Sequence, residues 1–221
     1  MVALVAFVAG AGFFLIGVFG AQNDRSDTEA FAPIEWVPSP SPAQSTQDTP
    51  SPTPAARPTA TPYAGAVARL KIPRFGVDSA IENLGLIPGR NELDIPKNPL
   101  HTGWYEIYDR PGFGGNALFS AHVDYFPDIK GPFFNLYQLE ADDEVVVVMD
   151  NGLDYRYRVI RKQRYDVATI PMGELIWPPS KAASVEWITL ITCGGRFRAY
   201  LGGNGSGEYL DRDVVVAERV R

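Results

Sequence analysis

The sequence is poor in the residues that build disulfides and metal centres. It contains one cysteine and two histidines among 221 residues. A single thiol excludes an intramolecular disulfide and any zinc site made of several cysteines, and two histidines are too few for a histidine-rich metal centre. The lone Cys193 is therefore a buried apolar side chain, an unused thiol or a nucleophile.

An excess of positive charge is also missing. The formal net charge is -6, whereas a nucleic-acid-binding protein normally presents a basic surface that displaces counterions from phosphates. We therefore expect no nucleic-acid partner. Apolar material is plentiful, because 45% of the residues are hydrophobic and 12% are aromatic. That amount is enough to build a core, and it excludes a wholly disordered chain.

Charged side chains are absent from residues 1–23, and residues 1–21 are almost wholly apolar. Such a run matches the ~20 residues that span the hydrocarbon core of a bilayer. A cleaved signal peptide is the alternative. However, no basic residue precedes the run, and the run is longer than the usual apolar region of about 7–15 residues in a signal peptide. Residues 1–23 therefore predict the transmembrane signal-anchor of a single-pass membrane protein.

Residues 24–64 have a different composition. Eight of the chain's 19 prolines lie between Pro38 and Pro62, mixed with serine, threonine, alanine and glutamine, and no periodic apolar pattern is present. A segment of this kind cannot bury enough surface to fold and favours extended, polyproline-like conformations. We predict a disordered Pro/Ser/Thr-rich linker that holds the following domain away from the bilayer.

Residues 65–221 have the pattern of a mostly β domain. Alternating or β-branched apolar runs are separated by glycine, proline and asparagine-glycine turns. Short helices are expected near residues 133–139 and 172–176. Six or more strands at this spacing predict a closed, mostly antiparallel barrel. The expected strands are residues 66–72, 77–86, 116–123, 143–150, 153–166, 185–193 and 213–220.

Cys193 ends the expected strand 185–193 and is followed by two glycines. This position predicts a thiol that projects from a rigid sheet into an open mouth. A thiol nucleophile needs a proton partner and a group that stabilises the electrophile. His122, at the end of another expected strand, is the candidate proton partner. His101 is the only alternative, and we interpret it as a loop residue with a structural or substrate-rim role.

A positive group must face the carbonyl oxygen as it becomes anionic. Arg212 opens the expected strand 213–220, and a guanidinium stays charged and offers several donors. Arg196 and Arg198 are closer to Cys193 in the sequence and remain alternatives.

Three motifs together resemble the sortase family of membrane-anchored transpeptidases. They are LITC ending at Cys193, AHVD around His122 and RDVV beginning at Arg212. The resemblance covers residues 65–221, and the segments GWY, HVD and TCGG are most similar to class E and F members, with a lean to class F. The chain departs from the family pattern in the long glycine-rich segment between the cysteine and the arginine. It also has Ala121 where a glycine often precedes the histidine.

The resemblance implies a closed sortase-type β-barrel of about eight strands in which Cys193, His122 and Arg212 meet. It implies that the thiol attacks the threonine carbonyl of an LPxTG-like sorting-signal peptide of a secreted protein. His122 would move the proton, Arg212 would hold the oxyanion, and Thr192 would support it with a hydroxyl donor. The acyl group would then pass to an amine of a peptidoglycan precursor or a pilin. No cofactor or metal is implied, and the catalytic domain would be extracellular, anchored in the cell membrane.

Other interpretations stay open at this point. Acidic residues between Glu140 and Glu144 suggest calcium, which some sortases bind, but their spacing is not that of an EF-hand loop and a solvated turn fits better. An L,D-transpeptidase also uses cysteine, histidine and arginine, but its histidine lies two residues before the cysteine, where this chain has Ile191. A tethered β-domain that binds wall polymer without chemistry predicts a buried, unreactive Cys193.

Overall fold

A computed structural model describes residues 62–126, 128–201 and 207–220. The predicted membrane helix, residues 1–23, and all but the last three residues of the predicted linker lie outside the described residues. Within the described ranges, no helix is long and apolar enough to cross a membrane. Tyr63 packs against the core, and its backbone N–H donates to the hydroxyl of Tyr155 over 3.1 Å. The end of the predicted linker therefore contacts the domain.

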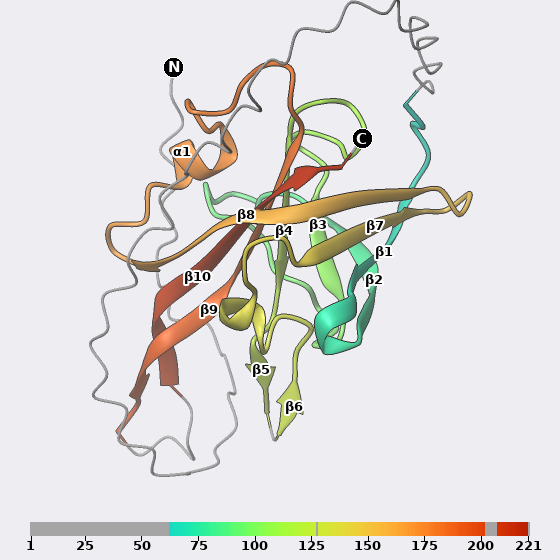
Figure 1. The fold of residues 1–221 in the computed structure, drawn as a ribbon. Coiled ribbons are helices and arrows are strands. Elements are labelled where there is room, and N and C mark those ends of the chain that lie inside the picture. The colour runs from blue at the N-terminus through green and yellow to red at the C-terminus, as the bar shows by residue number, and fades with distance from the viewer. Residues whose placement is uncertain (1–61, 127, 202–206, 221) are drawn as a thin grey trace, which may run out of the picture.

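Within the described part of the chain, eight strands close into a barrel in the order β1-β2-β3-β4-β9-β10-β8-β7 (Figure 1). The pairs β2–β3 and β4–β9 are parallel, and the other pairs are antiparallel. The predicted mostly β, closed barrel of about eight strands is thus confirmed. Its strands are β1 (Val67–Ile72), β2 (Val77–Leu84), β3 (Thr102–Tyr105), β4 (Asn116–Ala121), β7 (Glu144–Met149), β8 (Asp154–Asp166), β9 (Trp187–Ala199) and β10 (Gly207–Arg219).

The other described elements are short. Strands β5 (Asp124–Tyr125) and β6 (Ile129–Lys130) form a two-stranded sheet directly after β4 (Figure 1). The α-helix α1 spans Met172–Ile176, as expected, and the helical turn expected near residues 133–139 is the 3-10 helix η2. The 3-10 helices are η1 (Pro73–Phe75) and η2 (Leu136–Gln138).

Alternation along the strands divides the apolar side chains into two layers. The barrel interior holds the larger cluster, which includes Phe119 of β4 and Leu190 of β9, both fully buried. The second cluster joins α1 to the outer face of the wall and includes Leu118 and Ile191 from the same two strands. Because β4 and β9 are covered on both faces, they appear in the sequence as nearly continuous apolar runs.

Two expectations about strand ends are wrong. Cys193 does not end its strand, because β9 continues to Ala199, and Arg212 lies inside β10, which begins at Gly207. Most of the expected glycine-rich loop is an extended part of the β9–β10 hairpin (Figure 1). Gly194 stays in the ladder opposite Asp211. A glycine is a poor strand former by itself, so the neighbouring strand is what holds it extended.

Strand β3 was not expected at all. Its four residues, TGWY, are all buried, so they show no alternation. A Cβ on Gly103 would collide with the side chain of Leu84 and would make a tight contact with Pro96. The strand therefore depends on its parallel pairing with β2 and on this close approach, and neither feature is visible in four residues of sequence.

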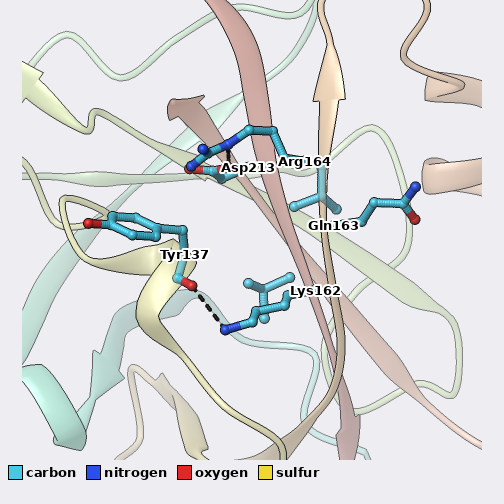
Figure 2. A pocket seen from close by; sticks show the side chains of 7 residues that line it. Tyr137, Lys162, Gln163, Arg164 and Asp213 are labelled. Atoms are coloured by element: carbon cyan, nitrogen blue, oxygen red, sulfur yellow. Dashed lines mark hydrogen bonds and ion pairs between the residues drawn. The ribbon is translucent and has the colours of Figure 1, made fainter. Parts of the chain in front are cut away.

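A largely buried ion pair joins β8 to β10. The Arg164 guanidinium donates to both carboxylate oxygens of Asp213 over 2.7 and 3.0 Å, and the Asp213 side chain is 6% exposed. Figure 2 shows the pair in a small pocket beside Tyr137, whose ring centroid lies 5.6 Å from the guanidinium carbon. Lys162 lines the same pocket and donates to the backbone carbonyl of Tyr137 over 3.1 Å. Arg164, Asp213 and Lys162 thus each bond to another residue of this pocket.

We expect Asp213→Ala to lower the free energy of unfolding by about 3 kcal/mol, because it leaves the Arg164 charge without its carboxylate in a low-dielectric position. Asp78→Ala is the matched control, since the Asp78–Arg69 pair has side chains 48% and 43% exposed. Its loss should be under about 1 kcal/mol. Urea unfolding of both variants gives the comparison, and equal losses would contradict the importance of burial.

Candidate active site

Strand β9 brings the three predicted site residues together through its pairing with both neighbours. On one side, β4 runs parallel and its last pair joins Ser120 to Ile191. Continuing that register by two residues places His122 beside Cys193. On the other side, β10 runs antiparallel and Arg212 faces Cys193 directly. Adjacent strands lie about 4.8 Å apart, so main-chain pairing sets the lateral spacing of all three residues.

The three side chains share the outer face of the barrel wall. Ile191 and Val214, each two residues from a site residue, belong to the outer cluster, and side chains two apart on a strand point the same way. Cys193, His122 and Arg212 line one open pocket of about 420 Å³, its mouth included. The other lining residues are Ile95, Pro96, Tyr105, Ser120, Ala121, Ile191 and Thr192.

His122 is held from two sides. Its Nε2 lies 2.9 Å from the carbonyl oxygen of Pro96, in the segment between β2 and β3. Its ring packs edge-on against Tyr125 with centroids 5.4 Å apart. The backbone carbonyl of His122 accepts the N–H of Phe133 over 3.2 Å. The imidazole orientation is therefore set by two segments that are far from Cys193 in the sequence.

The structure separates the three candidate arginines. Arg212 faces Cys193, and its Nη1 donates to the backbone carbonyls of Tyr209 and Asp211 over 3.1 and 2.9 Å. These bonds help to fix the position of the guanidinium beside the thiol. The positive charge of Arg212 lies close enough to the thiol to lower the pKa of Cys193.

Arg196 and Arg198 have different surroundings. Arg196 pairs with Asp211 at 2.6 Å and with Asp166 at 2.7 Å, and Arg198 pairs with Glu208. Their side chains are 61% and 63% exposed, and neither residue lines the pocket. Sequence proximity to Cys193 thus does not bring either one to the thiol.

The two glycines after Cys193 make room for carboxylates. A Cβ on Gly194 would collide with the Asp213 carboxylate, and a Cβ on Gly195 would collide with that of Asp211. Gly195 also has φ of 64°, a conformation that side-chain-bearing residues rarely adopt. The pair therefore lets β9 continue past the thiol while Asp211 and Asp213 lie close to its backbone.

Solved structures with a similar fold are sortases at low sequence identity. A SrtA sortase from Actinomyces oris matches with a TM-score of 0.50 and 20% identity, over 72% of this chain and 82% of that one. Sortase A from Corynebacterium diphtheriae matches with a TM-score of 0.49 and 20% identity, over 70% of this chain and 60% of that one. A search of curated proteins gives no significant match.

A protein-family comparison decides the relationship. The sortase domain model matches residues 70–220, most of the chain and nearly all of the barrel. This chain belongs to the sortase family. Sortases are cysteine transpeptidases, so the protein is an enzyme of this type, and the resemblance carried by the three motifs is confirmed at the level of the family.

The environment of the sortase's thiol favours its neutral form. Burial raises the pKa of Cys193 above its ordinary value, the positive charge of Arg212 opposes that rise, and the carboxylates of Asp124 and Asp213 reinforce it. The side chain is still partly accessible at the pocket wall. At neutral pH the thiol is therefore mostly protonated, and a proton acceptor is needed to make the nucleophile.

Tyr209 and Asp124 join the two sides of the sortase site and were missed by sequence reasoning. The Tyr209 hydroxyl donates to Asp124 Oδ2 over 2.5 Å. Asp124 follows His122 by two residues, and Tyr209 lies in the extended hairpin beyond Arg212. This hydrogen bond therefore ties the histidine segment to the cysteine–arginine hairpin. No signal in the sequence indicates it, because Tyr209 falls in the expected loop.

Thr192 faces the other way from Cys193. It is buried, and its hydroxyl donates to the backbone carbonyl of Ala121 over 2.8 Å. A threonine hydroxyl has a single hydrogen to donate. In this arrangement that hydrogen joins β9 to the end of β4, directly before His122.

The remaining candidates lie away from the pocket. His101 donates from Nδ1 to Glu82 over 2.9 Å and does not line the pocket. In the acidic turn before β7, Glu140 and Asp143 both bond Arg74, at 2.9 and 2.6 Å. The described residues contain no group of three or more histidine, cysteine or acidic side chains placed to hold a metal ion.

We expect the rate of alkylation of Cys193 by iodoacetamide to rise with pH into the alkaline range, because the thiolate is the nucleophile. Arg212→Gln removes the charge that lowers the pKa of the thiol, so the midpoint should move to higher pH. Asp124→Asn removes a charge that raises that pKa, so its midpoint should move to lower pH. Mass spectrometry reports the alkylated fraction of this single-thiol chain, and midpoints that do not move in opposite directions would contradict this electrostatic balance.

Proposed function

We propose that this sortase is a single-pass membrane protein whose extracellular domain cleaves an LPxTG-like sorting signal of secreted proteins. It transfers the acyl group to an amine of a peptidoglycan precursor or a pilin. The convergence of Cys193, His122 and Arg212 in one pocket carries the proposal. A nucleophile, a proton carrier and a fixed cation are the parts that acyl transfer requires. Ile95 and Ile191 give the same pocket an apolar wall suited to the leucine and proline of such a signal.

In the first half-reaction, the Cys193 thiol gives its proton to His122 and the thiolate attacks the threonine carbonyl carbon. The carbonyl π electrons move to the oxygen, and Arg212 stabilises that oxyanion. When the intermediate collapses, the threonine–glycine bond breaks and His122 returns the proton to the departing glycine amine. A thioester on Cys193 remains. The raised pKa of the thiol supports this order of events, because little thiolate is present before His122 accepts the proton.

In the second half-reaction, the incoming amine attacks the thioester carbonyl carbon. His122 accepts the proton that the amine nitrogen loses as the new amide forms, and the carbon–sulfur bond breaks. The Cys193 sulfur leaves and is reprotonated, which restores the starting enzyme. Arg212 faces the same oxygen in both steps. His122 therefore accepts a proton from the nucleophile in each half-reaction and gives it to the leaving group, the glycine amine in the first and the Cys193 sulfur in the second.

We assign Thr192 a supporting role different from oxyanion donation. Its hydroxyl hydrogen is engaged with the Ala121 carbonyl, and its side chain lies on the opposite face of β9 from the thiol. The bond joins the residue before Cys193 to the residue before His122. Thr192 thus keeps the two strand segments in register, and Arg212 supplies the charge that the oxyanion needs.

The membrane anchor and the extracellular location rest on residues 1–23 and on the proline-rich linker that follows. An apolar run of this length, joined to the barrel by an extended segment, suits an enzyme that meets secreted substrates at the outer membrane surface. Tyr63 packs on the barrel, so the tether ends against the domain itself.

The experiment that tests the proposed reaction uses the single cysteine. Incubating the protein with an LPxTG-like peptide should give an acyl adduct on Cys193 in intact-mass spectra, and adding an amine should remove it as the amide product. Cys193→Ala should give neither adduct nor product while keeping its fold. Turnover of the peptide by a folded Cys193→Ala variant would contradict the proposal.

The arginine assignment is tested by three alanine variants on one peptide. Arg212→Ala should lower kcat/KM by roughly 10²–10³-fold, the usual cost of losing an oxyanion donor. Arg196→Ala and Arg198→Ala should stay within a few-fold of wild type, because their guanidinium groups pair with carboxylates outside the pocket. A collapse of either of these variants with Arg212→Ala unaffected would overturn the assignment.

A further inference from the structure

The segment between β2 and β3 forms one wall of the active-site pocket, and its last residues bond to a carboxylate outside the pocket. Glu82 of β2 accepts the backbone N–H of Lys97 at Oε2 over 2.9 Å and that of Asn98 at Oε1 over 3.0 Å. Its Oε1 also lies 2.9 Å from Nδ1 of His101. One carboxylate thus closes the base of the segment through three hydrogen bonds.

The same segment reaches the catalytic pocket through the residue before Lys97. The Pro96 carbonyl oxygen lies 2.9 Å from Nε2 of His122, and Pro96 also lines the pocket. A carbonyl oxygen only accepts hydrogen bonds, so Nε2 must carry the hydrogen. In neutral imidazole the second nitrogen then has the free electron pair. The contact therefore specifies the tautomer of His122 and leaves Nδ1 as its basic nitrogen.

Glu82 is suited to hold this segment and has no place in the chemistry. It does not line the pocket, and its side chain is 22% exposed. Burial by itself would raise the pKa of Glu82, but the N–H groups of Lys97 and Asn98 and the His101 ring together hold that pKa below its ordinary value. The carboxylate is therefore ionised when it accepts these bonds, which makes them stronger than bonds between neutral groups.

We propose that Glu82 is a positioning residue for proton transfer. It fixes the Pro96 carbonyl against His122 Nε2–H, so that Nδ1 is the nitrogen that exchanges protons with the Cys193 thiol and with the amine groups of the substrates. This proposal rests on the proton-carrier role of His122 proposed above. Glu82 acts through the backbone of Lys97 and Asn98, with Pro96 as the group that touches the imidazole.

The tautomer can be observed without any turnover. In ¹⁵N spectra of the full chain, purified in detergent, the chain's two histidines give a simple set of imidazole signals, and His101→Gln assigns those of His122. We expect neutral His122 to carry its hydrogen on Nε2, with Nδ1 unprotonated. A neutral His122 with its hydrogen on Nδ1 would overturn the proposal, whatever the activity of the enzyme.

The role of the carboxylate is tested by Glu82→Gln. Glutamine keeps the size of the side chain but replaces one acceptor oxygen with an NH₂ group, which cannot accept from a backbone N–H. We expect kcat for acyl-enzyme formation to fall roughly 10- to 100-fold, the range that a small misplacement of a reacting group can cost. The Nε2–H signal of His122 should weaken or shift in the same variant.

Glu106→Gln is the matched control. Glu106 accepts a side-chain hydrogen bond from Asn83 Nδ2 over 3.0 Å, and Asn83 belongs to β2 and not to the segment. This variant should keep wild-type kcat and the wild-type His122 signals. His101→Ala, which leaves both backbone bonds to Glu82 in place, should fall between the control and Glu82→Gln.

The outcomes separate the two proposals. If Glu82→Gln lowers the free energy of unfolding but leaves kcat and the His122 signals as in Glu106→Gln, the residue is only structural and the positioning role is wrong. If wild type forms no acyl adduct on Cys193, the proposed function fails, while the tautomer of His122 still tests the contact with Pro96. If the Glu82→Gln variant does not fold, His101→Ala takes its place, and wild-type kcat with wild-type His122 signals in that variant would contradict the positioning role.

Discussion

The pairing of β9 with β4 on one side and β10 on the other is the constraint on which the site depends. Main-chain hydrogen bonds in these two ladders place His122 beside Cys193 and Arg212 opposite it. Because a shift of one residue would turn each side chain to the other face, the buried residues on both faces of β9 hold the register firmly. The thiol is thus placed by the core of the barrel.

Hydrogen bonds outside the ladders refine what the register sets. The Pro96 carbonyl holds one nitrogen of His122, and the Tyr209–Asp124 bond ties the segment after the histidine to the hairpin that carries the thiol and Arg212. Both bonds come from segments distant in the sequence. These bonds set the orientation of the imidazole. Strand pairing alone would not do so, because it fixes backbone positions and leaves the imidazole free to rotate.

The electrostatics of the site follow from its position on a covered sheet. Packing around Cys193 disfavours the thiolate, and a single cation, Arg212, acts against that burial and the two nearby carboxylates. A neutral thiol reacts more slowly with oxidants than a thiolate does. The same balance supports the proposed order of events, in which His122 accepts the proton of the thiol.

Much of this protein was determined by the sequence alone. The alternation and the apolar runs predicted most strands of a closed barrel, and the order of the histidine, cysteine and arginine motifs indicated the sortase family, because these features are local in the chain. Only the tertiary structure decided that Cys193 lies inside a longer strand and that Arg212 is the arginine that faces it. It alone also showed that Thr192 donates to Ala121. These features arise from pairing between segments far apart in the chain. Gly194 is held extended by the neighbouring strand β10, and the Thr192 hydroxyl has an acceptor because β4 lies beside β9.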